Sequence, residues 1–288
     1  MNINEVDKFI GNLEQEAHSE EEAHRLSLMM NEYAGEDQVV DTETYLQAMQ
    51  RLRGGDPYKV FSGMSQLDYL TEGFWEGNVV IVSGPTKEGK TTFCQTLTIN
   101  FAKMNQPVLW MPFDTPGEEL IKRFNNPITF YLPKKNATVK DLDWVEQKII
   151  EGLAKYNTRV IFIDHLGSLV HHEMDNSNYS TYLQHIMVRL KEIAMQWRVV
   201  IFLNHHISKI ATDQTPMLSN LKDSSGVAQE ADFVLMIWRK KERKAGVVDY
   251  TNYSKIQVQA NRRTGRSGLF EMRHMSDHFE EVQNEQET

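Results

Sequence analysis

Cysteine and long hydrophobic runs are both scarce in this chain. Cys94 is the single cysteine among 288 residues, so an internal disulfide is excluded, and we interpret this thiol as a small buried residue. No run approaches the roughly 20 apolar residues that span a bilayer, and the N-terminus is acidic where a secretory signal would be basic. Repeats and low-complexity tracts are absent as well. These absences predict a soluble protein of the cytoplasm with no membrane contact.

The net charge of −9 is spread unevenly along the chain. Residues 1–50 carry 12 acidic and 2 basic side chains, and residues 276–288 carry 5 acidic and none that is basic, whereas residues 51–275 have a net charge of +6. Between Trp238 and Met275 there are ten lysines and arginines and three acids. Such a basic stretch is either a surface for a polyanion or a solvated face, and composition does not separate the two.

Two helices are expected before residue 56. Apolar residues at helical spacing predict one over residues 3–33. The segment Asp41-Thr42-Glu43-Thr44 offers an N-cap for a second, Tyr45–Leu52, which would stop at Gly54-Gly55. Neither helix has enough apolar surface for a core of its own. We therefore expect both to dock on the main domain or on a neighbouring subunit.

From Val60 onward, short apolar runs alternate with helical patterns. Near-continuous Val/Ile runs separated by helices are typical of a parallel sheet covered on both faces, so the fold class is predicted to be α/β. The last two strands are close in sequence, which suggests antiparallel additions at one end of the sheet. The predicted strands are Val79–Val82, Val108–Met111, Val160–Ile163, Val199–Leu203, Phe233–Trp238 and Lys255–Ala260.

A glycine-rich loop follows the first of these strands. It fits the phosphate-loop pattern G-x-x-x-x-G-K-[ST], and a helix is predicted after it over Thr92–Met104. Backbone N–H groups of such a loop cradle phosphates, while Lys90 would reach the β- and γ-phosphates and the Thr91 hydroxyl would bind Mg²⁺. The pattern therefore predicts ATP with Mg²⁺ as the ligand. The nucleotide-binding residues are predicted to be Gly84, Pro85, Thr86, Lys87, Glu88, Gly89, Lys90, Thr91 and Thr92.

Acidic residues end two of the other predicted strands. Asp164 follows Val160–Ile163 about 75 residues after the glycine loop, which favours a role in holding Mg²⁺ over a role as a helix N-cap. Asp114 follows Val108–Met111 and could orient and polarise the water that attacks a γ-phosphate. Its competing role is a cap for a helix beginning near Pro116.

Two further groups of polar residues could contact phosphate. An imidazole at the end of Val199–Leu203, where His205 and His206 are adjacent, could donate a hydrogen bond to a phosphate oxygen; neighbouring residues of a strand face opposite ways, so the two cannot readily share one metal. The turn Asn261–Gly268 is basic and punctuated by glycine. One of its arginines could stabilise transition-state charge on a nucleotide held by an adjacent subunit.

Together these residues resemble the RecA-like ATPase domain of hexameric replicative DNA helicases, both the bacterial DnaB type and the phage primase–helicase type. The resemblance covers roughly residues 56–275 and places an acidic extension over 1–55 and an acidic tail over 276–288 on either side of it. It rests on Phe61-Ser62-Gly63 through Gly77, on the glycine loop, on Asp164-His165-Leu166, and on Pro216–Ser224 with Ala231-Asp232.

The resemblance also implies roles for single residues. Asp114 falls where the family usually has a catalytic Glu, and this shorter side chain puts the hydrolysis rate in question. His205 falls on the γ-phosphate sensor, and Arg239 and Arg262 fall where the family places basic residues that act on the neighbouring subunit. The family forms rings, typically hexamers, and single-stranded DNA would pass through the centre on loops around Lys209, Ser219 and Lys222.

The leading hypothesis is therefore an ATP-dependent DNA helicase or translocase for replication, encoded by a phage, with primase, polymerase or other replication proteins as possible partners. Two alternatives stay open. One is a RecA-like recombination mediator that binds single strands without unwinding, which the short N-terminus and Asp114 support. The other is a helicase loader or structural ring subunit with little turnover, which the acidic N-terminal helices support.

Overall fold

A computed structural model describes residues 39–53, 56–134, 141–169, 179–208, 214–221, 224–244 and 247–282. The chain divides into two units, Met1–Asp56 and Pro57–Thr288. In the first unit, α2 (Thr42–Arg53) begins where Asp41 Oδ1 accepts hydrogen bonds from the backbone N–H groups of Glu43 and Thr44, at 2.9 and 3.0 Å. Asp41 is therefore the N-cap among the four residues that the sequence offered, and the helix begins three residues before the predicted Tyr45. The helix expected over residues 3–33 lies outside the described residues.

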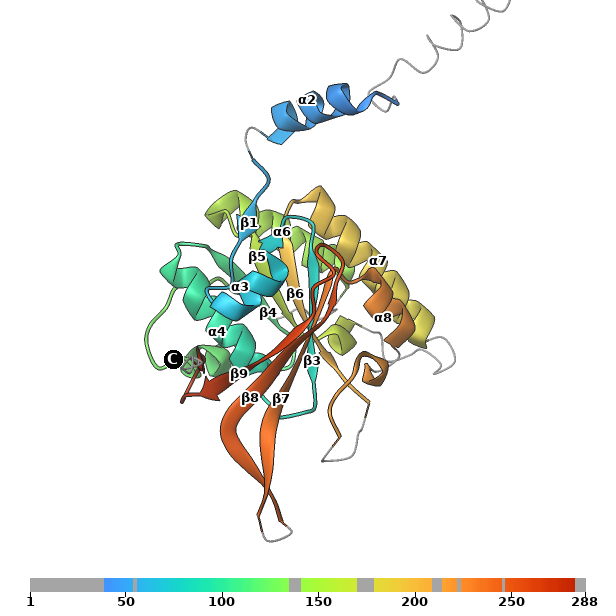
Figure 1. Cartoon of the computed structure of the whole chain (residues 1–288). Coiled ribbons are helices and arrows are strands. Elements are labelled where there is room, and N and C mark those ends of the chain that lie inside the picture. The colour runs from blue at the N-terminus through green and yellow to red at the C-terminus, as the bar shows by residue number, and fades with distance from the viewer. Residues whose placement is uncertain are drawn as a thin grey trace, which may run out of the picture. The chain divides into compact units, whose positions relative to one another are not determined.

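The second unit is built from alternating strands and helices (Figure 1). Its elements, in chain order, are β1 (Lys59–Val60), α3 (Ser65–Thr71), β2 (Phe74–Trp75), β3 (Val79–Gly84), α4 (Lys90–Lys103), β4 (Val108–Pro112), α5 (Gly117–Lys122), α6 (Leu142–Tyr156), β5 (Val160–Asp164), η1 (Leu166–Leu169), α7 (Tyr179–Gln196), β6 (Val200–His206), η3 (Leu218–Asn220), α8 (Ser224–Glu230), β7 (Phe233–Lys244), β8 (Val247–Asn261), β9 (Gly268–His274) and β10 (Phe279–Glu281).

Within the described residues the main sheet has the strand order β10-β9-β8-β7-β3-β6-β5-β4. The five strands from β7 to β4 are parallel, and β8, β9 and β10 continue the sheet in antiparallel pairs. The predicted mostly parallel α/β sheet is thus confirmed. One detail is wrong: Phe233–Trp238 pairs in parallel with β3, because α8 crosses over before β7 and reverses the chain direction.

Helices cover both faces of this sheet, so its central strands are buried on both sides. On one face, α6, α7 and α8 pack against residues such as Val79, Ile81 and Ile201. On the other, α3, α4 and α5 pack against Val80, Val82 and Phe202. Alternate residues of β3 thus face opposite cores, which explains why its sequence is a continuous apolar run and does not alternate with polar residues.

The sheet continues past residue 275, into the segment expected to be a separate tail. β10 pairs with β9, and Phe279 is 2% exposed. The backbone N–H of Phe279 donates a hydrogen bond of 2.8 Å to Thr96 Oγ1 on α4. Its ring lies over the glycine loop, where a Cβ at Gly89 would come within 2.9 Å of Phe279 Cζ. β10 is therefore part of the core beside the loop.

Beyond the body of the sheet, β7 and β8 continue as a long two-stranded ribbon (Figure 1). Among the described residues, no helix combines the length and the apolar character that crossing a bilayer requires.

Replacing Phe279 by Ala tests the packing of β10. We expect the free energy of unfolding to fall by about 3–5 kcal/mol, because a buried aromatic side chain is lost and a cavity is left. Urea denaturation followed by circular dichroism measures the change. Glu280→Ala on the same strand removes a side chain exposed by 54% and should change stability little. Equal, small effects of both substitutions would show that β10 is not part of the core.

Candidate active site

Four parallel strands end around one cavity of about 380 Å³. The glycine loop follows β3, and β4, β5 and β6 lie beside it in the sheet, so their carboxyl ends meet at the same edge. The side chains that line the cavity come from widely separated parts of the sequence. They are Thr86, Lys87, Gly89, Lys90, Thr91, Thr92, Asp114, Thr115, Arg123, Asp164, His165, His206, Arg239 and His274.

The two fixed glycines of the loop stand where a side chain would collide with its surroundings. At Gly84 the φ angle is +148°, and a Cβ would lie 1.9 Å from the carbonyl oxygen of Ile237 on β7. At Gly89 the φ angle is +108° and Phe279 blocks the same space. Only glycine suits both positions. The loop is further tied to β7, because Glu88 accepts a hydrogen bond from the Arg239 backbone N–H and pairs with Lys241 at 2.9 Å.

Lys90 is folded against the loop that carries it. Its Nζ donates hydrogen bonds to the carbonyl oxygens of Gly84 and Pro85, at 2.9 and 3.0 Å, and the residue is 8% exposed. Burial lowers the pKa of Lys90 to about 8, against the opposing effect of the Asp164 and Glu88 carboxylates. The ammonium group therefore remains mostly charged at pH 7 and lies among the groups that would face a phosphate.

The two residues predicted to hold Mg²⁺ are in contact. Thr91 Oγ1, in the first turn of α4, donates a hydrogen bond of 3.3 Å to Asp164 Oδ2 at the end of β5. Hydroxyl and carboxylate oxygens are the ligands that Mg²⁺ prefers, so this pair fits the ion. The N-cap alternative for Asp164 is disfavoured, since its carboxylate faces Thr91.

Asp114 is held by residues that follow β5. Its Oδ2 lies 2.7 Å from His165 Nε2, and its Oδ1 accepts a hydrogen bond of 2.8 Å from Ser168 Oγ. The alternative role as a helix cap is not supported, because α5 begins at Gly117 after Pro116 and has no side-chain cap. Asp114 keeps 45% of its side chain exposed, so the carboxylate still faces the cavity.

Of the two histidines at the end of β6, His206 reaches the cavity, whereas the family resemblance pointed to His205. His205 is 3% exposed and does not line the cavity. His206 lies opposite Gly84 in the β3–β6 register, and its ring is 4.5 Å from that of His165. Burial and the charge of Lys90 lower the pKa of His206 to about 4, so the imidazole is neutral at pH 7. Its buried Nδ1 has no hydrogen-bond partner among the described residues.

The two predicted arginines lie at opposite edges of the sheet. Arg239, on β7, lines the cavity of its own chain, and its Nη2 donates to the carbonyl oxygen of Thr251 at 2.9 Å. An action of Arg239 on a neighbouring subunit is therefore not supported, because its side chain is already beside its own loop. Arg262 follows Asn261, which pairs with the first residue of β7, so it lies at the edge away from the cavity.

Within its turn, Arg262 differs from the other arginines. Arg263 stacks on Trp75, with its Cζ 3.9 Å from the ring centroid, and Arg266 pairs with Glu72 at 3.1 Å. The Arg262 side chain is exposed and has no hydrogen bond or ion pair to any described residue. Of the three, it is the arginine available to a second molecule.

The predicted DNA contacts are only partly described. Ser219 lies in η3 and is exposed. Lys209 and Lys222 lie outside the described residues. The residues before them, Ser208 and Leu221, belong to two neighbouring backbone pairs: Ser208 N–H donates to the Asn220 carbonyl at 2.8 Å, and Ile207 pairs with Leu221. The basic stretch from Trp238 to Met275 is partly neutralised within the chain, since Lys240 pairs with Glu271 and Lys241 with Glu88. These two ion pairs take up two of its ten basic side chains.

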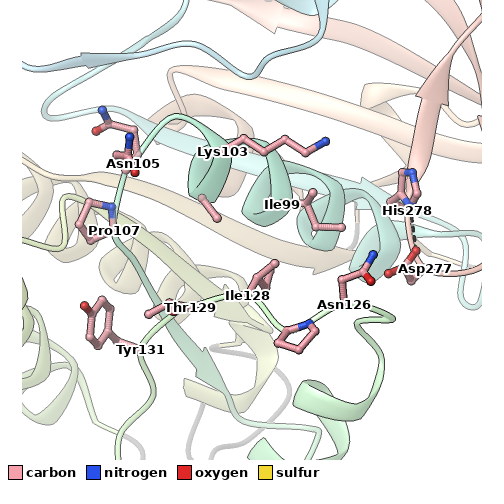
Figure 2. Close-up of a pocket in the computed structure, with 13 residues that line it drawn as sticks. Ile99, Lys103, Asn105, Pro107, Asn126, Ile128, Thr129, Tyr131, Asp277 and His278 are labelled. Atoms are coloured by element: carbon pink, nitrogen blue, oxygen red, sulfur yellow. Dashed lines mark hydrogen bonds and ion pairs between the residues drawn. The ribbon is translucent and has the colours of Figure 1, made fainter.

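A second, larger cavity of about 630 Å³ lies against the C-terminal half of α4. Figure 2 shows Ile99 and Lys103 of α4 on one side and Ile128, Thr129 and Tyr131 on the other, with His278 and Asp277 at one end. Its lining includes none of the loop residues. We therefore assign the chemistry to the smaller cavity.

Sequence reasoning assigned no role to His165, Ser168 or His274, and the resemblance preferred His205 to His206. His165 and Ser168 follow Asp164 within four residues, and a polar cluster after a predicted metal-binding strand was the available signal. His206 could have been found from strand alternation, because it shares a face with the buried Asn204, which contacts Cys94 on α4. His274 gave no local signal, since β9 brings it to the cavity only in the folded chain.

Comparison with known families and proteins agrees with this architecture. The family described as the DnaB-like helicase C terminal domain matches residues 125–281, and the KaiC ATPase family matches residues 60–127. A probable replicative DNA helicase of Trieres chinensis is 25% identical over 249 residues, which cover 73% of this chain and 55% of that protein. Replicative DNA helicase DnaB of Mycoplasma genitalium is 24% identical over 255 residues, covering 75% and 54%. The chain thus spans about half the length of the curated relatives it matches.

Two solved structures share the fold. One is an isolated ATPase domain, which superposes with a TM-score of 0.69 at 19% identity, and the match covers 85% of this chain and 100% of that one. The other is a DnaB-like replicative helicase, solved in a study of its interactions with primase. It also has a TM-score of 0.69, at 20% identity, and the match covers 97% of this chain and 75% of that one.

The depressed pKa of His206 predicts a specific loss of stability in acid. The unfolded chain has the ordinary histidine pKa near 6.5 and the folded chain a pKa of about 4, so the unfolded state binds more protons between these values. The stabilising contribution is complete above pH 6.5 and is lost as the pH falls toward 4. Urea denaturation from pH 7.5 to 4.5 should show a smaller loss for His206→Gln than for the unmodified protein.

NMR titration gives the direct measurement. The His206 ring should titrate near pH 4, well below the ordinary histidine value near 6.5. A midpoint near 6.5 for His206 would contradict its burial.

Proposed function

The chain belongs to the DnaB-like helicase C-terminal domain family, and from that membership and its site we propose that it is an ATP-driven motor acting on single-stranded DNA in replication. The observation that carries the proposal is that different groups lie at the two edges of the sheet, where the parallel strands end and where they begin. The residues predicted to bind phosphate and activate water line one cavity at one edge. Arg262, whose side chain has no hydrogen bond or ion pair to a described residue, lies at the other edge. A protein built this way completes its site when copies stand side by side.

In the proposed site, the backbone of residues 84–91 and the Lys90 ammonium bind the phosphates of ATP. Thr91 and Asp164 would hold Mg²⁺, which neutralises phosphate charge when bound. Arg239 and His274 line the same cavity with a planar guanidinium and a planar imidazole, groups that stack well on a nucleotide base.

Hydrolysis requires a water molecule placed in line with the γ-phosphate. Asp114 is the exposed carboxylate of the cavity that can accept a hydrogen bond from that water, because Asp164 faces Thr91. The neutral His206 ring beside Gly84 is placed to donate a hydrogen bond to the γ-phosphate and to change its contacts when that phosphate leaves. His206 thus takes the sensor role that the sequence assigned to its neighbour.

Assembly into a ring, with a hexamer as the expected form, would bring Arg262 of one copy to the phosphates held by the next. Single-stranded DNA would pass along the segment between Ile207 and Leu221, two residues that pair in an isolated bridge. Lys209, Ser219 and Lys222 are the proposed contacts. The small number of basic residues in this segment suits a DNA strand that must slide.

Primase is a reasonable partner, since a structurally similar helicase was studied with it. We also propose that the chain is phage-encoded. This proposal rests on the histidine in the proposed γ-phosphate sensor position and on the resemblance to phage enzymes.

The test is ATP hydrolysis with and without single-stranded DNA, on protein whose mass is followed by light scattering. We expect DNA to stimulate turnover by ring-sized particles. Lys90→Ala should abolish turnover, because it removes the buried ammonium group that would stabilise charge on the phosphates. DNA-independent turnover by a monomer would instead favour a loader or a recombination mediator, and full activity of Lys90→Ala would show that the loop is not the site.

The proposed action of Arg262 on a neighbouring copy makes a separate prediction. Arg262→Ala should leave nucleotide binding largely intact and reduce turnover by about 10³-fold or more, as loss of a transition-state arginine does. Arg266→Ala in the same turn is the matched control, because Arg266 is already paired with Glu72.

Mixing the Lys90→Ala and Arg262→Ala proteins extends this measurement. Mixed rings contain interfaces in which an intact loop meets an intact arginine, so part of the turnover should return. No recovery in mixed assemblies of normal mass would place Arg262 outside the neighbour's site.

A further inference from the structure

We propose that His165 is a positioning residue, which together with Ser168 fixes the carboxylate of Asp114 in the orientation from which it acts on water. The inference rests on the proposed function for its kinetic consequence. The contacts that support it lie within the folded chain itself. Both oxygens of Asp114 are bound from the turn after β5, by His165 Nε2 at 2.7 Å and by Ser168 Oγ at 2.8 Å.

The backbone decides which nitrogen of His165 carries the proton. The N–H of Gly167 donates a hydrogen bond of 2.9 Å to His165 Nδ1, so Nδ1 is the acceptor of the ring. A neutral imidazole with an unprotonated Nδ1 has its proton on Nε2. That proton points at Asp114 Oδ2, and the ring acts as a donor to the carboxylate.

This tautomer excludes the role of general base for His165. A base needs a free lone pair near the reacting water, and the single lone pair of the ring is occupied by Gly167 N–H. Asp114, in contrast, has about four acceptor positions on its two oxygens. Two are used by His165 and Ser168, and the exposed side of the carboxylate keeps the others for water.

The two strand ends that carry these residues are joined directly. The backbone N–H groups of Phe113 and Asp114 both donate to the carbonyl oxygen of Asp164, at 2.7 and 3.3 Å. Asp114 and the turn from His165 to Ser168 therefore keep a fixed relative position. An aspartate reaches less far than a glutamate, and this fixation reduces the number of orientations in which the shorter side chain is unproductive.

Metal binding is the alternative use of these residues. Asp114, His165 and His206 place one ligand atom each within 4.8 Å of one another, a spacing that suits an ion such as Zn²⁺. For the ion to bind His165 Nε2, the proton on that nitrogen would have to leave or move to Nδ1, where it would face the Gly167 N–H. The hydrogen-bond pattern thus favours a positioning pair over a metal site.

The kinetic test compares His165 variants at saturating Mg²⁺. His165→Ala should lower kcat by about 10- to 100-fold with an unchanged KM for ATP, because the carboxylate is misplaced while phosphate binding is intact. His165→Gln, whose amide can donate near the position of Nε2, should recover part of kcat. His185→Ala, an exposed histidine on α7, is the control for loss of an imidazole elsewhere.

A double substitution separates positioning from general destabilisation. If His165 acts through Asp114, then Asp114→Asn with His165→Ala should be no slower than Asp114→Asn alone. Independent, multiplying losses would overturn the proposal, as would an undiminished kcat for His165→Ala.

A turnover-free measurement decides the question even if the protein proves not to hydrolyse ATP. Long-range ¹H–¹⁵N NMR should show His165 protonated on Nε2 and not on Nδ1, and Asp114→Ala should alter the Nε2 signal. Protonation on Nδ1 would overturn the proposal. So would stoichiometric Zn²⁺ binding, measured against a chromogenic chelator, that is lost in His165→Ala and kept in His185→Ala.

Discussion

Parallel hydrogen bonding between β3, β6, β5 and β4 is the constraint on which the site depends. It aligns Gly84 with His206 and Pro112 with Asp164, so four strand ends that are far apart in sequence deliver their polar residues to one edge. Because side chains alternate along a strand, a slip of one residue would turn His206 away and bring His205 to the cavity. The continuous apolar strands, buried on both faces, stabilise the register that the chemistry requires.

Around this edge, close contacts leave the loop little freedom. The carbonyl of Ile237 and the ring of Phe279 occupy the space beside Gly84 and Gly89, and Glu88 joins the loop to β7. The antiparallel strands β7 to β10 therefore do more than extend the sheet. They support the phosphate loop from one side, while the turn after β5 supports Asp114 from the other. A site held on both sides can keep its donors oriented before a ligand arrives, which is the condition for electrostatic catalysis.

Several features of this arrangement could be predicted from the sequence, and the exceptions share one cause. The loop, its strand and helix, and the order of Asp114 and Asp164 follow from patterns a few residues long. Two adjacent histidines end the same strand, and packing alone decides that His206 is the one that lines the cavity. The direction of β7 and the inclusion of β10 were missed for a related reason, since both depend on pairing with strands distant in sequence.

The sequence by itself determined the chemistry that is possible: a glycine loop with a lysine and a threonine at fixed spacing, acids after apolar strands, and an arginine-rich turn. These are local, because backbone conformation and strand length are encoded within short segments. The tertiary structure alone decided which of these groups meet. It paired His165 with Asp114, brought Arg239 and His274 into the cavity and left Arg262 at the far edge. Such contacts depend on strand order and on the face each side chain occupies, and both are set by burial across the whole sheet.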